Sequence, residues 1–211
     1  LQRRFSPCTY ILQNRLRKDT VHSYHYRYLT GLYPEGDALL DLFIHPIDYV
    51  TFLFGAAQIK AVETIKSSHN GGITLFLILQ HRHLSGTLEL STDYSWQTAQ
   101  DLFDINTSKG IYSLNRMEVV DFTPKHSSVA GIPLEKVFKN NTSTINLYGR
   151  NGFIPTMENN QIYSQGFYSE IETFANIVEH KIKDAHISDF DSLKNTYRLM
   201  DEIREQIQKV T

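Results

Sequence analysis

Apolar and polar side chains alternate along the segment from Val21 to Tyr28. Tyr24, Tyr26 and Tyr28 fall on one side of an extended chain, and polar residues stand between them. A period of two indicates a strand with one face buried, and aromatic side chains pack well on a pleated surface. The pattern predicts a half-buried β-strand from Val21 to Tyr28.

The spacing of apolar residues changes after this strand. Between Ala38 and Phe54 they recur three and four positions apart, as on one stripe of a helix. Pro34-Glu35-Gly36 interrupts the chain before this segment, and Gly55 provides a common helix stop after it. The sequence therefore predicts a helix over Ala38–Phe54.

Short runs rich in β-branched and aromatic residues fill the middle of the chain. Glycine-containing turns at Asn70-Gly71-Gly72 and at Ser85-Gly86 separate the first three of them, as hairpin turns do. The predicted strands are Gln58–Lys66, Ile73–His83, Thr87–Tyr94, Leu102–Asn106, Ile111–Leu114, Glu118–Phe122 and Thr144–Tyr148.

The last part of the chain carries two amphipathic patterns, from Phe167 to Ile182 and from Leu193 to Val210. Each has the spacing of a helix with one buried stripe. Together with the strands they predict an α+β fold, in which a largely antiparallel open sheet has its helices packed on one face.

The segment from Ile73 to Leu79 is apolar at nearly every position instead of alternating. A strand of this kind is usually covered on both faces, whereas the predicted helices cover only one. A second copy of the same sheet is the simplest cover for the other face, so we expect a homodimer or a higher homo-oligomer. The alternative is that the loops from Ser95 to Thr144 fold back over this face.

Composition limits the class of protein. The chain has 211 residues, with 41% hydrophobic and 21% charged residues, as in a single folded domain. A net charge of -2 provides no basic field for a nucleic-acid backbone. The longest apolar run, Leu75–Leu79, is far too short to cross a bilayer. We expect neither nucleic acid nor membrane as a partner.

Two features of the chain concern its origin. Cys8 is its only cysteine and excludes an intrachain disulfide, so a reducing cytoplasm is the default location. The sequence begins at Leu1 without an initiator Met or a signal peptide. We interpret it as one domain, residues 1–211, of a longer protein.

The most informative chemistry lies in the predicted helix. Asp41 and His45 are four positions apart, where a carboxylate can hold an imidazole in one tautomer and raise its basicity. Asp48 is three positions beyond His45, although Pro46 should start or kink a helical turn between them. Such a spacing suits acid–base catalysis, but it is also common in helix caps and surface contacts.

The motif Asp41-x-x-x-His45-x-x-Asp48, between Tyr33–Leu40 and Phe52–Gly55, resembles the signature helix of the glucose–fructose oxidoreductase / inositol dehydrogenase / MocA (Gfo/Idh/MocA) family. Similar resemblances are found in Arg3-Arg4-Phe5-Ser6-Pro7, where that family's chain leaves its nucleotide-binding domain, and in the two terminal helices. The resemblance covers nearly the whole chain, and it is sharp only in the signature helix.

This resemblance implies the C-terminal domain of an NAD(P)-dependent oxidoreductase that acts on a sugar, a polyol or a related compound. His45 would be the general acid/base for the substrate hydroxyl, Asp41 its orienting partner, and Asp48 a substrate-binding residue. The chain contains neither a G-x-G-x-x-G nor the family's Glu-Lys-Pro, so NAD or NADP would be bound by an N-terminal Rossmann domain absent from this chain. The family usually has two consecutive glycines before this helix, whereas this chain has Gly36-Asp37. Alone, the chain would be inert.

Two alternatives come from other classes of function. The first is a stand-alone, non-catalytic α+β domain for binding or scaffolding, in which Asp41 and His45 have no chemical role. The second is a metal site at His81-x-His83 with His22-x-x-His25 nearby. Because no third ligand has a recognisable spacing, we expect surface histidines and no metal.

Overall fold

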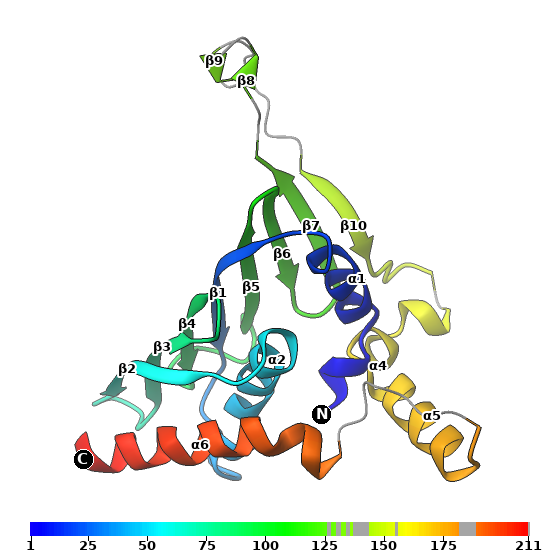
Figure 1. The fold of residues 1–211 in the computed structure, drawn as a ribbon. Coiled ribbons are helices and arrows are strands. Elements are labelled where there is room, and N and C mark those ends of the chain that lie inside the picture. Colours follow the sequence, from blue (N-terminus) through cyan, green and yellow to red (C-terminus); the bar gives the residue numbers. More distant parts are fainter. Residues whose placement is uncertain are drawn as a thin grey trace.

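The computed structural model describes residues 1–125, 128–129, 132–133, 136, 144–154, 156–181 and 189–210. Its centre is an eight-stranded sheet in the order β10-β7-β6-β5-β1-β4-β3-β2 (Figure 1). The strands of this sheet are β1 (Val21–Leu29), β2 (Gln58–Lys66), β3 (Ile73–Gln80), β4 (Ser85–Ser91), β5 (Gln100–Thr107), β6 (Gly110–Asn115), β7 (Val119–Pro124) and β10 (Ile145–Gly149).

Neighbouring strands of the large sheet are antiparallel, apart from the parallel pair β1 and β4. A separate two-stranded sheet joins β8 (Ser128–Val129) to β9 (Ile132–Pro133). The predicted fold, a largely antiparallel open sheet in an α+β domain, is confirmed.

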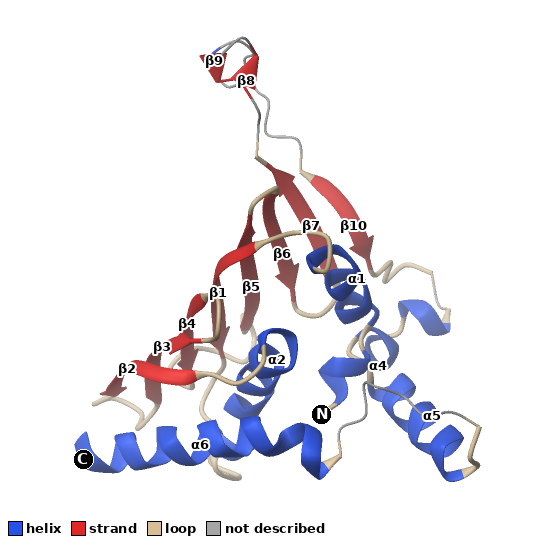
Figure 2. Cartoon of the chain, in the orientation of Figure 1, coloured by secondary structure: helices blue, strands red, loops and turns tan. Residues whose placement is uncertain are grey.

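The described helices lie on one side of the large sheet (Figures 1 and 2). They are η1 (Gln2–Phe5), α1 (Pro7–Leu16), the π-helical η2 (Leu39–Phe43), α2 (Ile44–Phe54), η3 (Met157–Asn159), α4 (Gln161–Ser164), α5 (Phe167–Val178) and α6 (Phe190–Val210). The three predicted helices are present, although the first is divided into η2 and α2. Residue 182, where the second was expected to end, lies outside the described residues.

The helix α1 was not predicted. Its amphipathic pattern is weak, but its first turn carries a local signal: Pro7 is at the first position, and the Ser6 hydroxyl accepts a hydrogen bond from the Cys8 amide at 3.2 Å. Cys8 and Leu12 are buried in the core. A serine followed by proline could therefore have located this helix.

The expected hairpin turn at Ser85-Gly86 is wrong. Both residues belong to β4, and the loop between β3 and β4 consists of residues 81–84. Gly86 pairs with Tyr24 of β1, and a Cβ atom on it would lie only 2.1 Å from the Tyr24 ring. Glycine is required here because an aromatic ring packs over the strand, and not because the chain turns.

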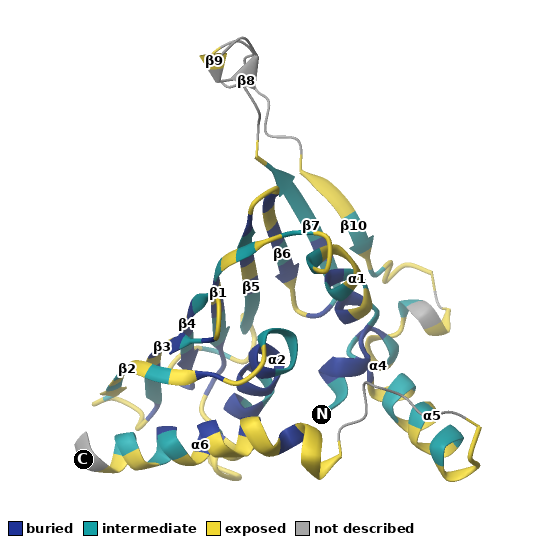
Figure 3. Ribbon diagram, viewed as in Figure 1, coloured by how far each residue is buried: buried dark blue, intermediate teal, exposed yellow. Residues whose placement is uncertain are grey.

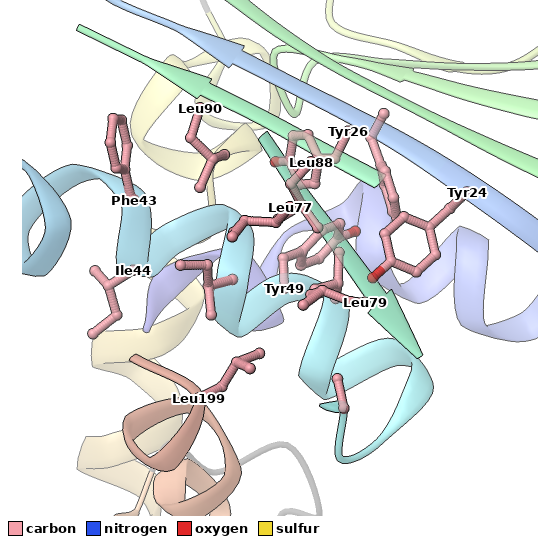
Figure 4. Packing of buried hydrophobic residues seen from close by; sticks show 14 of the residues in the cluster. Tyr24, Tyr26, Phe43, Ile44, Tyr49, Leu77, Leu79, Leu88, Leu90 and Leu199 are labelled. Atoms are coloured by element: carbon pink, nitrogen blue, oxygen red, sulfur yellow. The ribbon is translucent and has the colours of Figure 1, made fainter. Parts of the chain in front are cut away.

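The main core lies between the sheet and α2. Leucines of β3 and β4 pack with Tyr24 and Tyr26 against Tyr49 of α2, and Leu199 of α6 lies against the same cluster (Figure 4). Figure 3 shows this buried layer between the sheet and the helices. The signature helix is therefore held on its inner side by the sheet and by α6.

The strand β3 is covered on one face only. Leu75, Leu77 and Leu79 are fully buried, whereas Phe76 and Ile78 are 41% and 45% exposed. Between residues 95 and 144, the described strands β5, β6 and β7 belong to the same sheet, and β8 and β9 form a separate two-stranded sheet. Among the described residues, no element covers the exposed side chains of β3, and the fold-back alternative also involves residues that lie outside the described ones.

Across the described residues, no helix combines the length and the apolar character that crossing a bilayer requires.

Candidate functional site

His45 is the second residue of α2 and follows directly on the π-helical segment η2. A π-helical turn contains more residues than an α-helical one, and such turns are frequent at functional sites. Pro46 lies in the first turn of α2, where its missing N–H is tolerated. The sequence predicted that a helical turn starts or kinks at Pro46, and the structure instead has the π-helical segment η2 just before α2.

A cavity of about 420 Å³ opens beside His45. Its walls come from η1, the end of β1, the start of β5, the β6–β7 turn and α4, which are far apart in the sequence. The residues that carry charge or could carry charge in these walls, apart from tyrosine, are Arg3, His45, Asp101 and Arg116.

Arg3 and Asp101 form an ion pair in the cavity wall, with 2.9 Å between Nη2 and Oδ2. The Tyr26 hydroxyl donates to Asp101 Oδ1 at 2.9 Å, and the Arg3 guanidinium lies over the Tyr28 ring. Asp101 thus balances the charge of Arg3. Asp101 could not be identified from the sequence alone, because nothing in its local sequence distinguishes it from any other strand aspartate.

His45 is held in its neutral form. Burial is the main cause, and the positive charge of Arg3 adds to it, so the pKa falls from 6.5 to about 4. The Nδ1 atom is buried and has no hydrogen-bond partner among the described residues. A buried polar atom without a partner is costly to folding, so it requires an explanation beyond stability.

The structure does not bring Asp41 to His45. The Asp41 carboxylate instead accepts a hydrogen bond from the Asp37 amide at 3.0 Å, which closes the turn that opens the helix. A Cβ atom on Gly36 would lie 2.2 Å from Asp41 Oδ2, so this glycine leaves room for the carboxylate. Asp41 is exposed, and the walls of the cavity do not include it.

Asp48 is also not placed for substrate. It is 1% exposed and receives two hydrogen bonds from Arg4 and one, at 2.8 Å, from the Thr196 hydroxyl. These contacts use both carboxylate oxygens. Asp48 is a buried residue that links η1, α2 and α6, because it lies on the side of α2 that faces the core.

Two of the four histidines considered for metal, His25 and His81, have other partners, and His81 is not the surface histidine that was expected, because it is 2% exposed. His81 Nδ1 donates to the Gly55 carbonyl at 2.9 Å, which leaves Nε2 to accept from the Tyr24 hydroxyl at 2.9 Å. His25 Nδ1 lies 2.7 Å from the Thr87 hydroxyl. The part of the chain that the structure describes contains no group of three His, Cys, Asp or Glu side chains arranged to hold a metal ion.

Comparison with known proteins gives structural matches only. No family model matches the sequence, and no curated protein matches it. A dehydrogenase (MviM) from Clostridium difficile superposes with a TM-score of 0.71 at 15% identity, over 97% of this chain and 60% of that one. A dehydrogenase from Chromobacterium violaceum gives 0.68 at 14% identity, over 99% and 62%.

A Gfo/Idh/MocA family oxidoreductase from Vibrio cholerae gives a TM-score of 0.64 at 15% identity, over 99% of this chain and 60% of that one. The chain thus spans about three fifths of the length of these similar structures. At such low identity the likeness shows the fold, and the resemblance seen in the sequence is confirmed at that level.

Proposed function

We propose that this chain is the substrate-binding and oligomerisation domain of an NAD(P)-dependent oxidoreductase of the Gfo/Idh/MocA family, acting on a sugar, a polyol or a related compound. The observation that carries the proposal is His45, a neutral histidine with a buried, unpartnered Nδ1 in the wall of a cavity. The fold agrees with it, since the similar structures include several dehydrogenases. The cytoplasm is its proposed location.

The chemistry assigned to His45 is the transfer of one proton. Oxidation of an alcohol removes a hydride from carbon and a proton from oxygen, and a bound nicotinamide supplies the acceptor for the hydride. His45 is neutral near pH 7 and can accept the hydroxyl proton. In the reverse reduction it returns that proton to the substrate oxygen.

The cofactor would be bound outside this chain. The sequence has no G-x-G-x-x-G, the glycine motif that holds the pyrophosphate of a dinucleotide. We therefore assign no nucleotide-binding residue here. The 3-ketoreductase KijD10 from Actinomadura kijaniata, whose structure contains NADP, is longer than this chain, which covers 57% of it.

The substrate class agrees with what is named for the similar structures. One is a UDP-N-acetylglucosamine 3-dehydrogenase (GnnA) from Acidithiobacillus ferrooxidans, with a TM-score of 0.64 and 16% identity. The cavity walls here carry several side-chain amides, including Gln100, Gln161 and Gln165, which can bond to hydroxyl groups.

The alternative is a stand-alone, non-catalytic binding or scaffolding domain. One observation favours it: Asp41 is bonded to the Asp37 amide and does not orient His45. In the enzyme, His45 would act without Asp41, because Asp41 belongs to η2 and only His45 of the two lies in the cavity wall. The two proposals differ in whether His45 has a kinetic role.

The experiment is a kinetic comparison in the complete enzyme, with its nucleotide-binding domain. His45→Asn should lower kcat by about 10²–10⁴-fold with a smaller change in KM, as expected when a general acid/base is lost. His69→Asn, in the exposed turn between β2 and β3, is the matched control and should behave as wild type. An unchanged kcat in His45→Asn across the pH range would leave the scaffolding domain as the function.

A further inference from the structure

A second hollow adjoins the cavity beside His45. It has a volume of about 440 Å³, and its walls share Ala99, Gln100 and Arg116 with the first cavity. The second hollow is lined by residues at the ends of β5, β6 and β7 and by Tyr94, which is 48% exposed. A ligand that starts at His45 and passes Gln100 and Arg116 would enter the second hollow.

Gln100 offers an unused acceptor between the two hollows. Its Oε1 atom is buried and has no hydrogen-bond partner among the described residues. An amide oxygen accepts hydrogen bonds and cannot donate them, so only a donor such as a hydroxyl group satisfies it. Gln100 and His45 both line the first cavity, and each has a buried polar atom without a hydrogen-bond partner among the described residues.

Arg116 is held in place by an unusual backbone. It and Met117 form the β6–β7 turn with φ angles of 51° and 55°, in the left-handed region that non-glycine residues rarely adopt. The Arg116 amide donates to the Asp101 carbonyl at 2.8 Å, and Nη2 donates to the Ala99 carbonyl at 2.9 Å. Met117 is 1% exposed and anchors the turn in the core. The guanidinium is thus fixed at the boundary between the hollows.

The charge of Arg116 is not balanced by a carboxylate. Arg3 is paired with Asp101 in the first cavity, and Glu118 of the second hollow is paired with Arg150 at 3.0 Å. No ion pair to Arg116 occurs within the part of the chain that the structure describes. His45 is neutral and each wall carboxylate is paired with another arginine, so Arg116 is the cation of these walls that has no ion-pair partner among the described residues.

We propose that the two hollows bind a sugar carrying a phosphate group, with hydroxyls at His45 and Gln100 and the phosphate at Arg116. This inference rests on the proposed function and specifies its substrate class. A guanidinium matches the geometry of a phosphate with two parallel hydrogen bonds. The second hollow favours phosphate over carboxylate, because a phosphate can link the sugar to a further group whereas a carboxylate ends the molecule.

Binding to the 211-residue chain tests the inference directly. Calorimetric titrations would use glucose, galactose and mannose, their 1-phosphates, and glucuronate as the carboxylate probe. We expect at least one 1-phosphate to bind about tenfold or more tightly than its parent hexose, as a charge-assisted pair allows. Arg116→Met should abolish this preference, and Arg116→Lys should restore part of it.

Two further variants separate the roles. Arg82→Met removes one exposed arginine at the opposite end of β4 and should leave the preference intact. Gln100→Met should weaken the hexose and its phosphate by the same factor, because it removes a hydroxyl contact.

Equal affinities for hexoses and their phosphates would overturn the inference, as would undetectable phosphate binding or a preference that survives Arg116→Met. Tighter binding of glucuronate than of the phosphates would overturn the substrate class. Oxidation of neutral hexoses by the complete enzyme, independent of Arg116, would refute this inference and leave the proposed function standing. Loss of His45 dependence would refute the function itself.

Discussion

The Arg4 guanidinium donates two hydrogen bonds to the Asp48 carboxylate, one of them from Nε to Oδ2 at 2.9 Å. Both side chains are almost completely buried, with 2% and 1% exposure. The Thr196 hydroxyl adds a bond to Asp48, so the pair joins η1, α2 and α6. Because Arg3 lies on η1 and His45 on α2, the pair connects the two elements that carry these cavity residues.

Removal of this carboxylate should be strongly destabilising. Asp48→Ala leaves the Arg4 charge buried and unpaired, and we expect a loss of about 3–5 kcal/mol in the free energy of unfolding. Urea denaturation followed by circular dichroism measures it. Glu202→Ala is the control, because it removes a half-exposed helix pair with Arg198 and should cost less than about 0.5 kcal/mol. Equal losses in the two variants would refute the connecting role of Asp48.

The state of His45 predicts a pH dependence of stability. Its folded-state pKa of about 4 lies below the unfolded value of 6.5. The neutral ring therefore contributes stability that is fully present above pH 6.5 and is lost as the pH falls through about 4. In His45→Gln the free energy of unfolding should fall less between pH 7 and pH 4.5 than in wild type.

The control for this prediction is His69→Gln, whose side chain is exposed and should leave the pH profile unchanged. A nuclear magnetic resonance titration of the ring protons gives an independent reading. A midpoint near pH 6.5 for His45 would contradict the burial that the structure shows.

The sequence predicted the sheet and the position of His45 because both depend on local periodicity. Strand β1 alternates and β2 matches its predicted bounds, since each has one face against the core. His45 reaches the cavity because Ile47 and Val50 on the same helix are buried. Such patterns can be recognised in the sequence because the burial of one face of a helix or strand determines which of its positions are apolar.

The contacts around His45 could not be predicted in the same way. The expected pairing of Asp41 with His45 requires regular α-helical spacing. Asp41 lies in the π-helical η2, where a turn contains more residues, so positions four apart do not share a face as they do in an α-helix. Asp101 and Arg116 come from β5 and the β6–β7 turn, and only the register of the sheet brings them to the cavity. Their roles depend on tertiary structure, which a single sequence does not display.

The isolated 211-residue chain should not bind a dinucleotide. A pyrophosphate is usually held by a glycine-rich turn at the start of a helix, and the sequence lacks that motif. Fluorescence titration with NADH and NADPH should therefore show no saturable binding up to millimolar concentration. Micromolar binding by this chain would contradict the assignment of the cofactor to a separate domain.

The open face of the sheet carries exposed apolar side chains. Ile65, Phe76 and Ile78 expose 52%, 41% and 45% of their surface on neighbouring strands, and no described element covers them. The adjacent strands add an Arg27–Glu89 ion pair at 2.8 Å, so the face is mixed rather than purely apolar. A second copy of the same face offers matching apolar and polar strips, and two-fold pairing is the commonest closed arrangement. We therefore expect a homodimer or a higher oligomer in solution.

Phe76→Lys should convert this oligomer into a folded monomer, because it places a charge at the centre of the apolar strip. Leu77 is unsuitable for this test, since it is 1% exposed on the opposite face and Leu77→Glu would disrupt the core. Phe153→Lys, at a fully exposed position outside the sheet, is the matched control and should keep the wild-type mass. Light scattering coupled to size exclusion measures the mass. A wild-type monomer at high micromolar concentration would refute pairing through this face, because a dimer with a buried apolar strip would persist there.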